Sequence, residues 1–315
     1  DSLLNNPHHH PPKFTRACLK PKRCDFFDTC WQLPSPSAFD LLQTSYKEKE
    51  HFFKHKITHL SQLPPFMPDL SPAQRMQINS ESNQTPYCNI TVVKPFFNTL
   101  MFPIYCLDIE AVTHTISVYS KNNFFERVPF LFSVHKLNKW HTTPIHNDYF
   151  IGQSSTPFRD IATALIQSCK HAGSIIVYDA MLEKQIMKEC ITHCPDLEHP
   201  LREILSKIID LSLLFKKCHI YFPGMLGRFS LKAIHQAISP HKGHQDLTLQ
   251  SGADALDHMK HYLKSSPVEQ AQLEQDMRNY CKMDTKALLD ILLSIKSLVL
   301  PKRSLLESLK HRFFS

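Results

Sequence analysis

The sequence lacks a long hydrophobic run, since no stretch reaches about 18 consecutive apolar residues. A helix needs about 20 such residues to cross a bilayer, so we predict no transmembrane helix and no membrane partner. The N-terminus, Asp-Ser-Leu-Leu-Asn-Asn-Pro-His-His-His, also lacks the pattern of a secretory signal peptide. These absences predict a cytoplasmic protein.

The sequence also lacks a compact framework of paired cysteines. Its 10 cysteines are scattered along 315 residues, which favours reduced thiols inside a cell over disulfides in a secreted domain. It shows no internal repeat and no initiator methionine. The missing methionine leaves open a fragment or a processed form.

Enough apolar material is present to build a full core. Apolar residues make up 42% of the chain and charged residues 21%, which fits one large domain or one domain with a smaller module. The formal net charge of +7 suits a polyanionic partner such as DNA or RNA. The same charge also fits a modest excess spread over a large surface. The oligomeric state is left open.

From about residue 98 the pattern is that of an α/β domain. Apolar runs predict strands over residues 104–112, 128–137, 174–178 and 208–211, with a turn at Asn122-Asn123 before the second. Helices are predicted over residues 156–171, 181–190, 230–237, 252–263 and 266–298. Ser266-Pro267-Val268-Glu269 is a capping box that opens the last of these helices. Strands that come first and then alternate with helices predict a mixed sheet flanked by helices.

The region before this domain reads as a mostly irregular and helical extension rich in cysteine and proline. Residues 38–60 can carry a helix, and Ser71-Pro72-Ala73-Gln74 predicts a helix over residues 72–79. Polar residues 80–90 predict a loop. We divide the chain into a Cys-rich segment (1–36), a helical linker (37–97), the α/β domain (98–298) and a basic tail (299–315).

Two acids interrupt the first apolar strand. Asp108 and Glu110 are two residues apart, so they project from the same face of a strand. Burying both is costly unless a cation compensates, and Mg²⁺ prefers such hard oxygen ligands. The alternative is an edge strand on which both acids face water.

Two further positions carry acids next to regular elements. Asp179 and Glu183 follow a short apolar strand, near the strand ends where open α/β sheets place ligands. Asp179 is predicted to be a helix N-cap, and Glu183 is either a ligand or a solvated helix residue. Tyr280 and Asp284 share one face of the last predicted helix, where the phenol could orient or help to deprotonate an attacking water.

Together these motifs resemble the DEDDy branch of the ribonuclease H-like 3′–5′ exonuclease superfamily. Asp108-Ile109-Glu110 matches its first motif, and Tyr280-Cys281-Lys282-Met283-Asp284 matches its third. Asp179-Ala180-Met181-Leu182-Glu183 matches the second motif loosely, with Glu183 where the family has Asp. Gly173-Ser174-Ile175-Ile176-Val177-Tyr178 and Gly227-Arg228-Phe229-Ser230-Leu231-Lys232 extend the resemblance to an uncharacterised bacterial branch, whose members often carry an upstream RecB-like iron–sulfur nuclease domain.

The resemblance implies a ribonuclease H-like fold and a two-metal nuclease. Asp108, Glu110, Glu183 and Asp284 would hold two Mg²⁺ or Mn²⁺ ions, and Tyr280 would position the attacking water. Arg228 and Lys232 would contact the phosphate backbone of nucleic acid, although both also read as ordinary surface charge.

A regular cysteine triad lies near the N-terminus. Cys18, Cys24 and Cys30 are six residues apart, and thiolates so spaced can ligate Zn²⁺ or an iron–sulfur cluster. The triad resembles the C-terminal end of iron–sulfur RecB-like nucleases, whose fourth cysteine lies far upstream. Here the fourth ligand would come from a longer form of the chain or from His10. Three free thiols are the alternative.

Three hypotheses follow for the whole chain. The first is a metal-dependent nuclease, with 3′–5′ exonuclease action on DNA or RNA. The second is a catalytically inert nucleic-acid-binding module, suggested by the loosened second motif. The third is a truncated remnant of a two-nuclease protein.

Overall fold

The computed structural model describes residues 14–20, 23–67, 69–116, 124–240 and 243–300. The chain forms two compact units. The first unit comprises Asp1–Tyr87 and Tyr221–Arg228, and the second comprises Cys88–Ile220 and Phe229–Ser315. Within the described ranges, no helix is long and apolar enough to cross a membrane.

The second unit is built on a mixed sheet of five strands, in the order β4-β3-β2-β5-β6. The strands are β2 (Ile104–Ile116), β3 (Phe124–Leu137), β4 (Ile145–Phe150), β5 (Ser174–Val177) and β6 (Ile208–Asp210). β3 runs antiparallel to β2 and β4, whereas β5 runs parallel to β2 and β6. The predicted α/β class and mixed sheet are confirmed. β2 is the third of the five strands and is not an edge strand, although its pairing with β5 covers only Ile104–Cys106.

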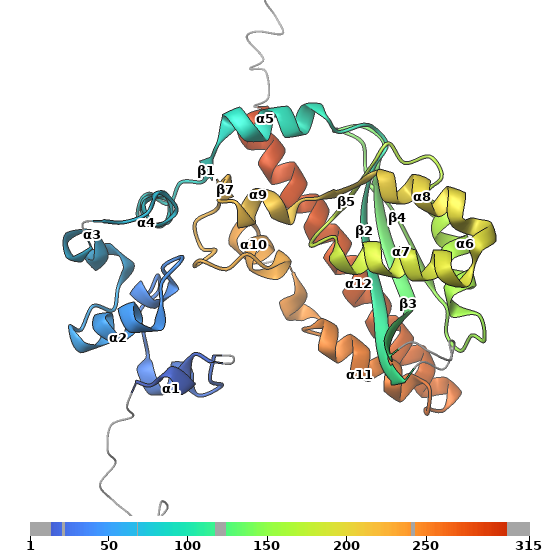
Figure 1. Ribbon diagram of the computed structural model, residues 1–315, viewed down its shortest axis with the longest axis horizontal. Coiled ribbons are helices and arrows are strands. Elements are labelled where there is room, and N and C mark those ends of the chain that lie inside the picture. The colour runs from blue at the N-terminus through green and yellow to red at the C-terminus, as the bar shows by residue number, and fades with distance from the viewer. Residues whose placement is uncertain (1–13, 21–22, 68, 117–123, 241–242, 301–315) are drawn as a thin grey trace, which may run out of the picture. The chain divides into compact units, whose positions relative to one another are not determined.

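Helices cover both faces of this sheet. Tyr105, Leu107 and Ile109 of β2 pack against α6 (Pro157–Cys169), α7 (Met181–His193) and α8 (Glu198–Ser206). The other face packs against α11 (Gly252–Tyr262) and α12 (Pro267–Val299), and Figure 1 shows α7 and α12 on opposite sides of the strands. Because side chains alternate along a strand, Asp108 and Glu110 belong to the face that α12 covers.

Local signals set the ends of the longest helix. The Ser266 N–H donates to the Glu269 carboxylate at 3.0 Å, and Pro267 occupies the first helical position, where its missing N–H costs no hydrogen bond. The predicted start of α12 is therefore confirmed, and the helix runs one residue past its predicted end. The remaining helices of this unit are α5 (Ile90–Asn98), α9 (Ser212–Lys216) and α10 (Leu231–Ile238).

Several elements were not expected from the sequence, among them α5, β4 and α8. α5 contains Pro95, which lacks a backbone donor and normally argues against a helix interior. β4 contains several polar residues and is held in the sheet by its pairing with β3. α8 contains Pro200 within its first turn. The turn expected at Asn122-Asn123 lies outside the described residues.

The first unit consists of short helices around an aromatic cluster made of Phe14, Phe27, Trp31, Phe39 and Phe53. They are α1 (Phe27–Trp31), α2 (Tyr46–Lys54), α3 (Leu63–Phe66) and α4 (Pro72–Asn83). The helix predicted over residues 38–60 is confirmed only in its middle, since single 3₁₀ turns occupy Ala38–Asp40 and Leu60–Gln62. α4 starts at the predicted cap, because Ser71 Oγ accepts from the Gln74 N–H. It continues through part of the predicted loop.

The buried face of α4 is unusually polar. The Glu81 carboxylate accepts hydrogen bonds from the Tyr221 hydroxyl at 2.7 Å and from the N–H groups of Gly224 and Leu226 at 2.9 and 3.2 Å. Gly227 has a φ of +68°, and a Cβ there would lie 2.2 Å from the Asp40 carbonyl oxygen, so only glycine fits. These contacts fix residues 221–228 in the first unit. β1 (Tyr87–Cys88) pairs with β7 (Ile220–Tyr221) in a separate two-stranded sheet.

Candidate active site

The central strand β2 carries the first two acids of the site. Asp108 and Glu110 are only half-buried by their surface exposure, and Asp108 lies opposite Ser133 of β3. The pairing of β2 with β3 shifts register directly after Glu110. Such bulges bend a strand and redirect its side chains, and they often lie beside functional sites.

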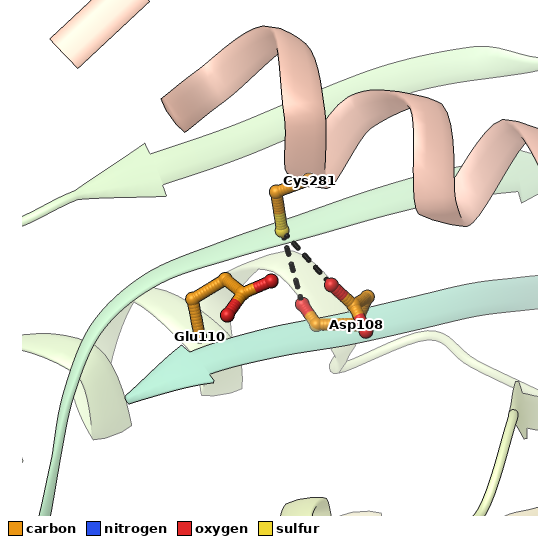
Figure 2. Close-up of side chains that lie close together, drawn as sticks. All are labelled: Asp108, Glu110 and Cys281. Atoms are coloured by element: carbon orange, nitrogen blue, oxygen red, sulfur yellow. Dashed lines mark hydrogen bonds between the residues drawn. The ribbon is translucent and has the colours of Figure 1, made fainter. Parts of the chain in front are cut away.

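Helix α12 brings three more side chains to this face. Tyr280, Cys281 and Asp284 are all buried. Cys281 Sγ lies 3.2 Å from Asp108 Oδ2, and Figure 2 shows the thiol directed from α12 toward the two acids of β2. Asp108, Glu110 and Cys281 each offer one ligand atom, and these atoms lie within 4.8 Å of one another. These three residues therefore form a group that could hold a metal ion.

Glu183 completes a set of four acids. It lies in the first turn of α7 with only 3% of its surface exposed. Its Oε2 atom is buried and has no hydrogen-bond partner among the described residues. Burial raises the pKa of Glu183 to about 8, and the charge of Asp108 adds to this rise. The interpretation of Glu183 as a solvated helix residue is therefore wrong.

Asp179 does not cap α7, contrary to the sequence prediction. Its φ is +64°, and its carboxylate pairs instead with Lys216 Nζ at 2.9 Å. Asp210, at the end of β6, accepts from the N–H groups of Asp179 and Ala180 at 3.0 and 3.2 Å. An acid from the neighbouring strand thus fixes the turn that leads to Glu183, and the sequence pattern gave no sign of it.

The acids strongly perturb one another. Burial raises the pKa of Asp108 to about 7, and the charge of Asp284 contributes further. Burial and the charges of Asp108 and Asp284 also raise the pKa of Glu110 well above its usual range. Four carboxylates in one partly buried place repel one another unless cations are present. The site therefore has the charge and the donor atoms to attract divalent cations.

Lys232 of α10 lies beside these acids. Its Nζ donates to the Tyr280 hydroxyl at 2.8 Å and to the Gln250 carbonyl oxygen at 2.6 Å. Burial lowers the pKa of Lys232, whereas the surrounding acids oppose that change. Burial and the charges of Asp284, Glu110 and Asp108 raise the pKa of Tyr280, so the phenol stays protonated at neutral pH. Tyr280 is thus suited to orient a group by hydrogen bonding and unsuited to act as a base.

Arg228 and Lys232 fall in different units of the chain. Arg228 belongs to the first unit, where it lines a pocket of about 670 Å³ together with Arg23, Asp40 and Lys49. Lys232 belongs to the second unit. Arg228 thus lines the pocket of the first unit, and Lys232 contacts Tyr280 in the second unit.

Two members of the site were missed by sequence reasoning. His244 Nε2 lies 2.6 Å from Asp284 Oδ1, and its ring packs edge-on against Tyr280. His244 lies in a short 3₁₀ turn (His244–Asp246), so no periodic pattern identifies it. Cys281 was predicted to be a core residue, and it is fully buried. Its spacing of three residues from Asp284 was the available signal that it also faces the acids.

The N-terminal cysteine triad is not gathered into a ligand set. Cys18 and Cys24 are half-buried against the aromatic cluster, and Cys30 is exposed. In the part of the chain that the structure describes, the three sulfurs do not come together closely enough to share an ion. His10 lies outside the described residues. Zinc or iron–sulfur binding at this triad stays a prediction for a longer form.

Comparison with known proteins gives one match. A family model described as a domain of unknown function (DUF2779) matches residues 105–230. The matched segment contains Asp108, Glu110, Glu183 and Arg228 but ends before α10 and α12. No curated protein and no solved structure matches the chain significantly.

Proposed function

We propose that this chain is a metal-dependent nuclease with a ribonuclease H-like fold that hydrolyses phosphodiester bonds of DNA or RNA, with 3′–5′ exonuclease action. The proposal combines the sequence motifs with the site geometry. The mixed five-stranded sheet flanked by helices agrees with the architecture that the resemblance implies. The net charge of +7 suits a nucleic-acid partner, and we place the protein in the cytoplasm.

One observation carries the proposal. Carboxylates from β2, α7 and α12 act on one another electrostatically, and Glu183 keeps one oxygen without a partner in the described structure. A buried polar atom without a partner normally costs about 1–3 kcal/mol, and more when it is charged. A divalent cation would supply the missing partner and offset the repulsion. The residues therefore fit a metal site.

Each residue has a defined role in this proposal. Asp108, Glu110, Glu183 and Asp284 would hold two Mg²⁺ or Mn²⁺ ions, which would activate the attacking water and stabilise the leaving oxygen. Tyr280, held by Lys232, positions the attacking water through its hydroxyl. His244 holds the Asp284 carboxylate in its orientation through their 2.6 Å contact.

One observation favours a second function, that of an inert nucleic-acid-binding module. Lys232 brings a fixed positive charge to the acids and donates to Tyr280. An ammonium group at this place partly neutralises the acids without a metal. In that case the fold would bind nucleic acid but would not cleave it.

The two functions are separated by assaying purified protein on 5′-labelled single- and double-stranded DNA and RNA with Mg²⁺, Mn²⁺ or EDTA. We expect metal-dependent cleavage that falls at least about 100-fold in Asp108→Asn and Asp284→Asn, the scale at which loss of one preorganised electrostatic group acts. Progressive shortening from the 3′ end would establish polarity.

Asp257→Asn is the matched control, because Asp257 is an exposed acid of α11 that pairs with Lys260. It should cleave at the wild-type rate. A folded wild-type protein that binds nucleic acid equally well with and without the two site substitutions, and never cleaves it, would contradict the nuclease and support the inert module.

A further inference from the structure

We propose that Cys281 is a metal ligand, and that its thiolate joins Asp108 and Glu110 in holding a thiolate-binding transition-metal dication such as Co²⁺ or Zn²⁺ in preference to Mg²⁺. This inference rests on the metal site of the proposed function and adds a ligand to it. It also narrows the choice of metal.

The distance between the donor atoms supports a shared ion. Two ligand atoms about 2.3 Å (sulfur) and about 2.1 Å (oxygen) from one ion lie about 3.1 Å apart at a right angle and about 3.6 Å apart in a tetrahedron. The observed distance from Cys281 Sγ to Asp108 Oδ2 is 3.2 Å. The Glu110 carboxylate lies within the same 4.8 Å limit.

The sulfur is held in place by regular structure. Cys281 is fully buried on α12, and Asp108 and Glu110 project from the central strand β2. Figure 2 shows the three side chains converging from these two elements. Ligands on rigid elements lose little conformational freedom when an ion binds, so the arrangement is largely preorganised.

A second, independent observation points to a ligand here. Glu183 is almost completely buried, and its Oε2 has no hydrogen-bond partner among the described residues. The charge that acts most strongly on Glu183 is that of Asp108, the same acid that Cys281 contacts. Asp108 is therefore the acid that both the carboxylate of α7 and the thiol of α12 interact with.

The chemistry of the donors selects the ion. Mg²⁺ takes hard oxygen ligands and retains its waters, whereas thiolates bind softer cations. On binding, the S–H proton leaves to solvent as the metal–sulfur bond forms, so no redox step is involved. Without this bond, Cys281 is a buried thiol that donates weakly to Asp108.

The test is titration of the metal-free protein with Co²⁺ alone, followed by near-ultraviolet absorption. A thiolate-to-cobalt charge-transfer band is expected in the wild type and is expected to vanish in Cys281→Ser and Cys281→Ala. Co²⁺ affinity measured by calorimetry should fall at least about 10-fold in both Cys281 variants, whereas Mg²⁺ affinity should change little.

Cys169→Ser is the matched control, because Cys169 is equally buried on α6 and packs in a different core cluster from Cys281. This variant should retain the band. Circular dichroism checks that each variant is folded.

The outcomes separate this inference from the proposed nuclease. Co²⁺ binding without the band, or a band that persists in both Cys281 variants, overturns the inference and leaves the nuclease standing. A Cys281-dependent band in a protein that never cleaves nucleic acid supports the inference and contradicts the nuclease. Failure to bind Co²⁺ at all also overturns the inference, whereas the nuclease is then decided separately by the cleavage assay with Mg²⁺ or Mn²⁺.

Discussion

Glu183 shows how one side chain couples the acidic site to pH. Its folded-state pKa of about 8 lies above the ordinary value of 4.5, and that of Asp108 is about 7 instead of 3.8. In the metal-free protein, the folded state therefore retains protons that the unfolded chain has already lost. The contribution of these two groups to the free energy of unfolding is fully present below a pH of about 4. It declines as the pH rises through their folded-state pKa values.

We predict that the free energy of unfolding of the metal-free protein falls between pH 5.5 and 8, by up to about 1.4 kcal/mol per pH unit for each such group. Glu183→Gln should flatten this slope, because an amide does not titrate. Urea unfolding in EDTA at several pH values measures the slope of the free energy of unfolding against pH. Glu198→Gln, whose side chain is 44% exposed on α8, is the control. Equal slopes in the wild type and Glu183→Gln would refute the prediction.

At the scale of elements, a buried polar contact joins α12 to the sheet. Thr285 Oγ1 lies 2.9 Å from Ser133 Oγ and 2.8 Å from His135 Nδ1. Burial and the charge of His146 lower the pKa of His135 to about 4, so its ring is neutral at pH 7. Thr285 lies one residue after Asp284, and its contacts therefore help to set how α12 presents its acid to β2.

Replacing Thr285 by valine should destabilise the protein by about 1–3 kcal/mol, because Ser133 and His135 lose a buried partner while the volume is kept. Denaturant unfolding measures the change. The same substitution at Thr192, which is exposed on α7, should cost less than about 0.5 kcal/mol. A double-mutant cycle with Ser133→Ala should show coupling between the two hydroxyls; strict additivity would argue against the contact.

Elements with strong local signals were predictable, and the contents of the site were predictable only in part. The capping boxes at Ser71 and Ser266 and the apolar run of β2 depend on neighbouring residues, so the sequence predicted them. His244 and Lys232 reach the acids through a turn and through helix packing. Neither can be predicted from a periodic pattern in the neighbouring sequence. Cys281 was predicted as a buried residue, but its contact with Asp108 depends on how α12 crosses β2. Whether these residues act as proposed stays a prediction.

At the scale of the whole molecule, the first unit depends on a segment far along the chain. Glu81 accepts three hydrogen bonds from Tyr221, Gly224 and Leu226. In the described contacts, these three donors bond to no carboxylate other than Glu81. The Glu81 carboxylate therefore organises residues 221–228. Its loss would leave buried donors unsatisfied.

We therefore expect Glu81→Ala to reduce hydrogen-exchange protection in residues 221–228 and in the neighbouring α4, while β2 and α12 keep theirs. Loss of a buried charged acceptor should cost the first unit at least about 1–3 kcal/mol. Glu50→Ala, at an ion pair on α2 of the same unit, should have little effect. Unchanged exchange of residues 221–228 in Glu81→Ala would exclude this role for Glu81.

The bond from Tyr221 to Glu81 spans 140 positions of sequence, and this has a consequence during synthesis. At about 5–20 residues per second, a ribosome needs roughly 10–30 s to make that interval. Until the later segment emerges, Glu81 and the polar buried face of α4 lack their partners in the nascent first unit. The position that only Gly227 fits is also unfilled. All five strands of the sheet of the second unit are made within this interval. The first unit therefore stays incomplete until that later segment has been made.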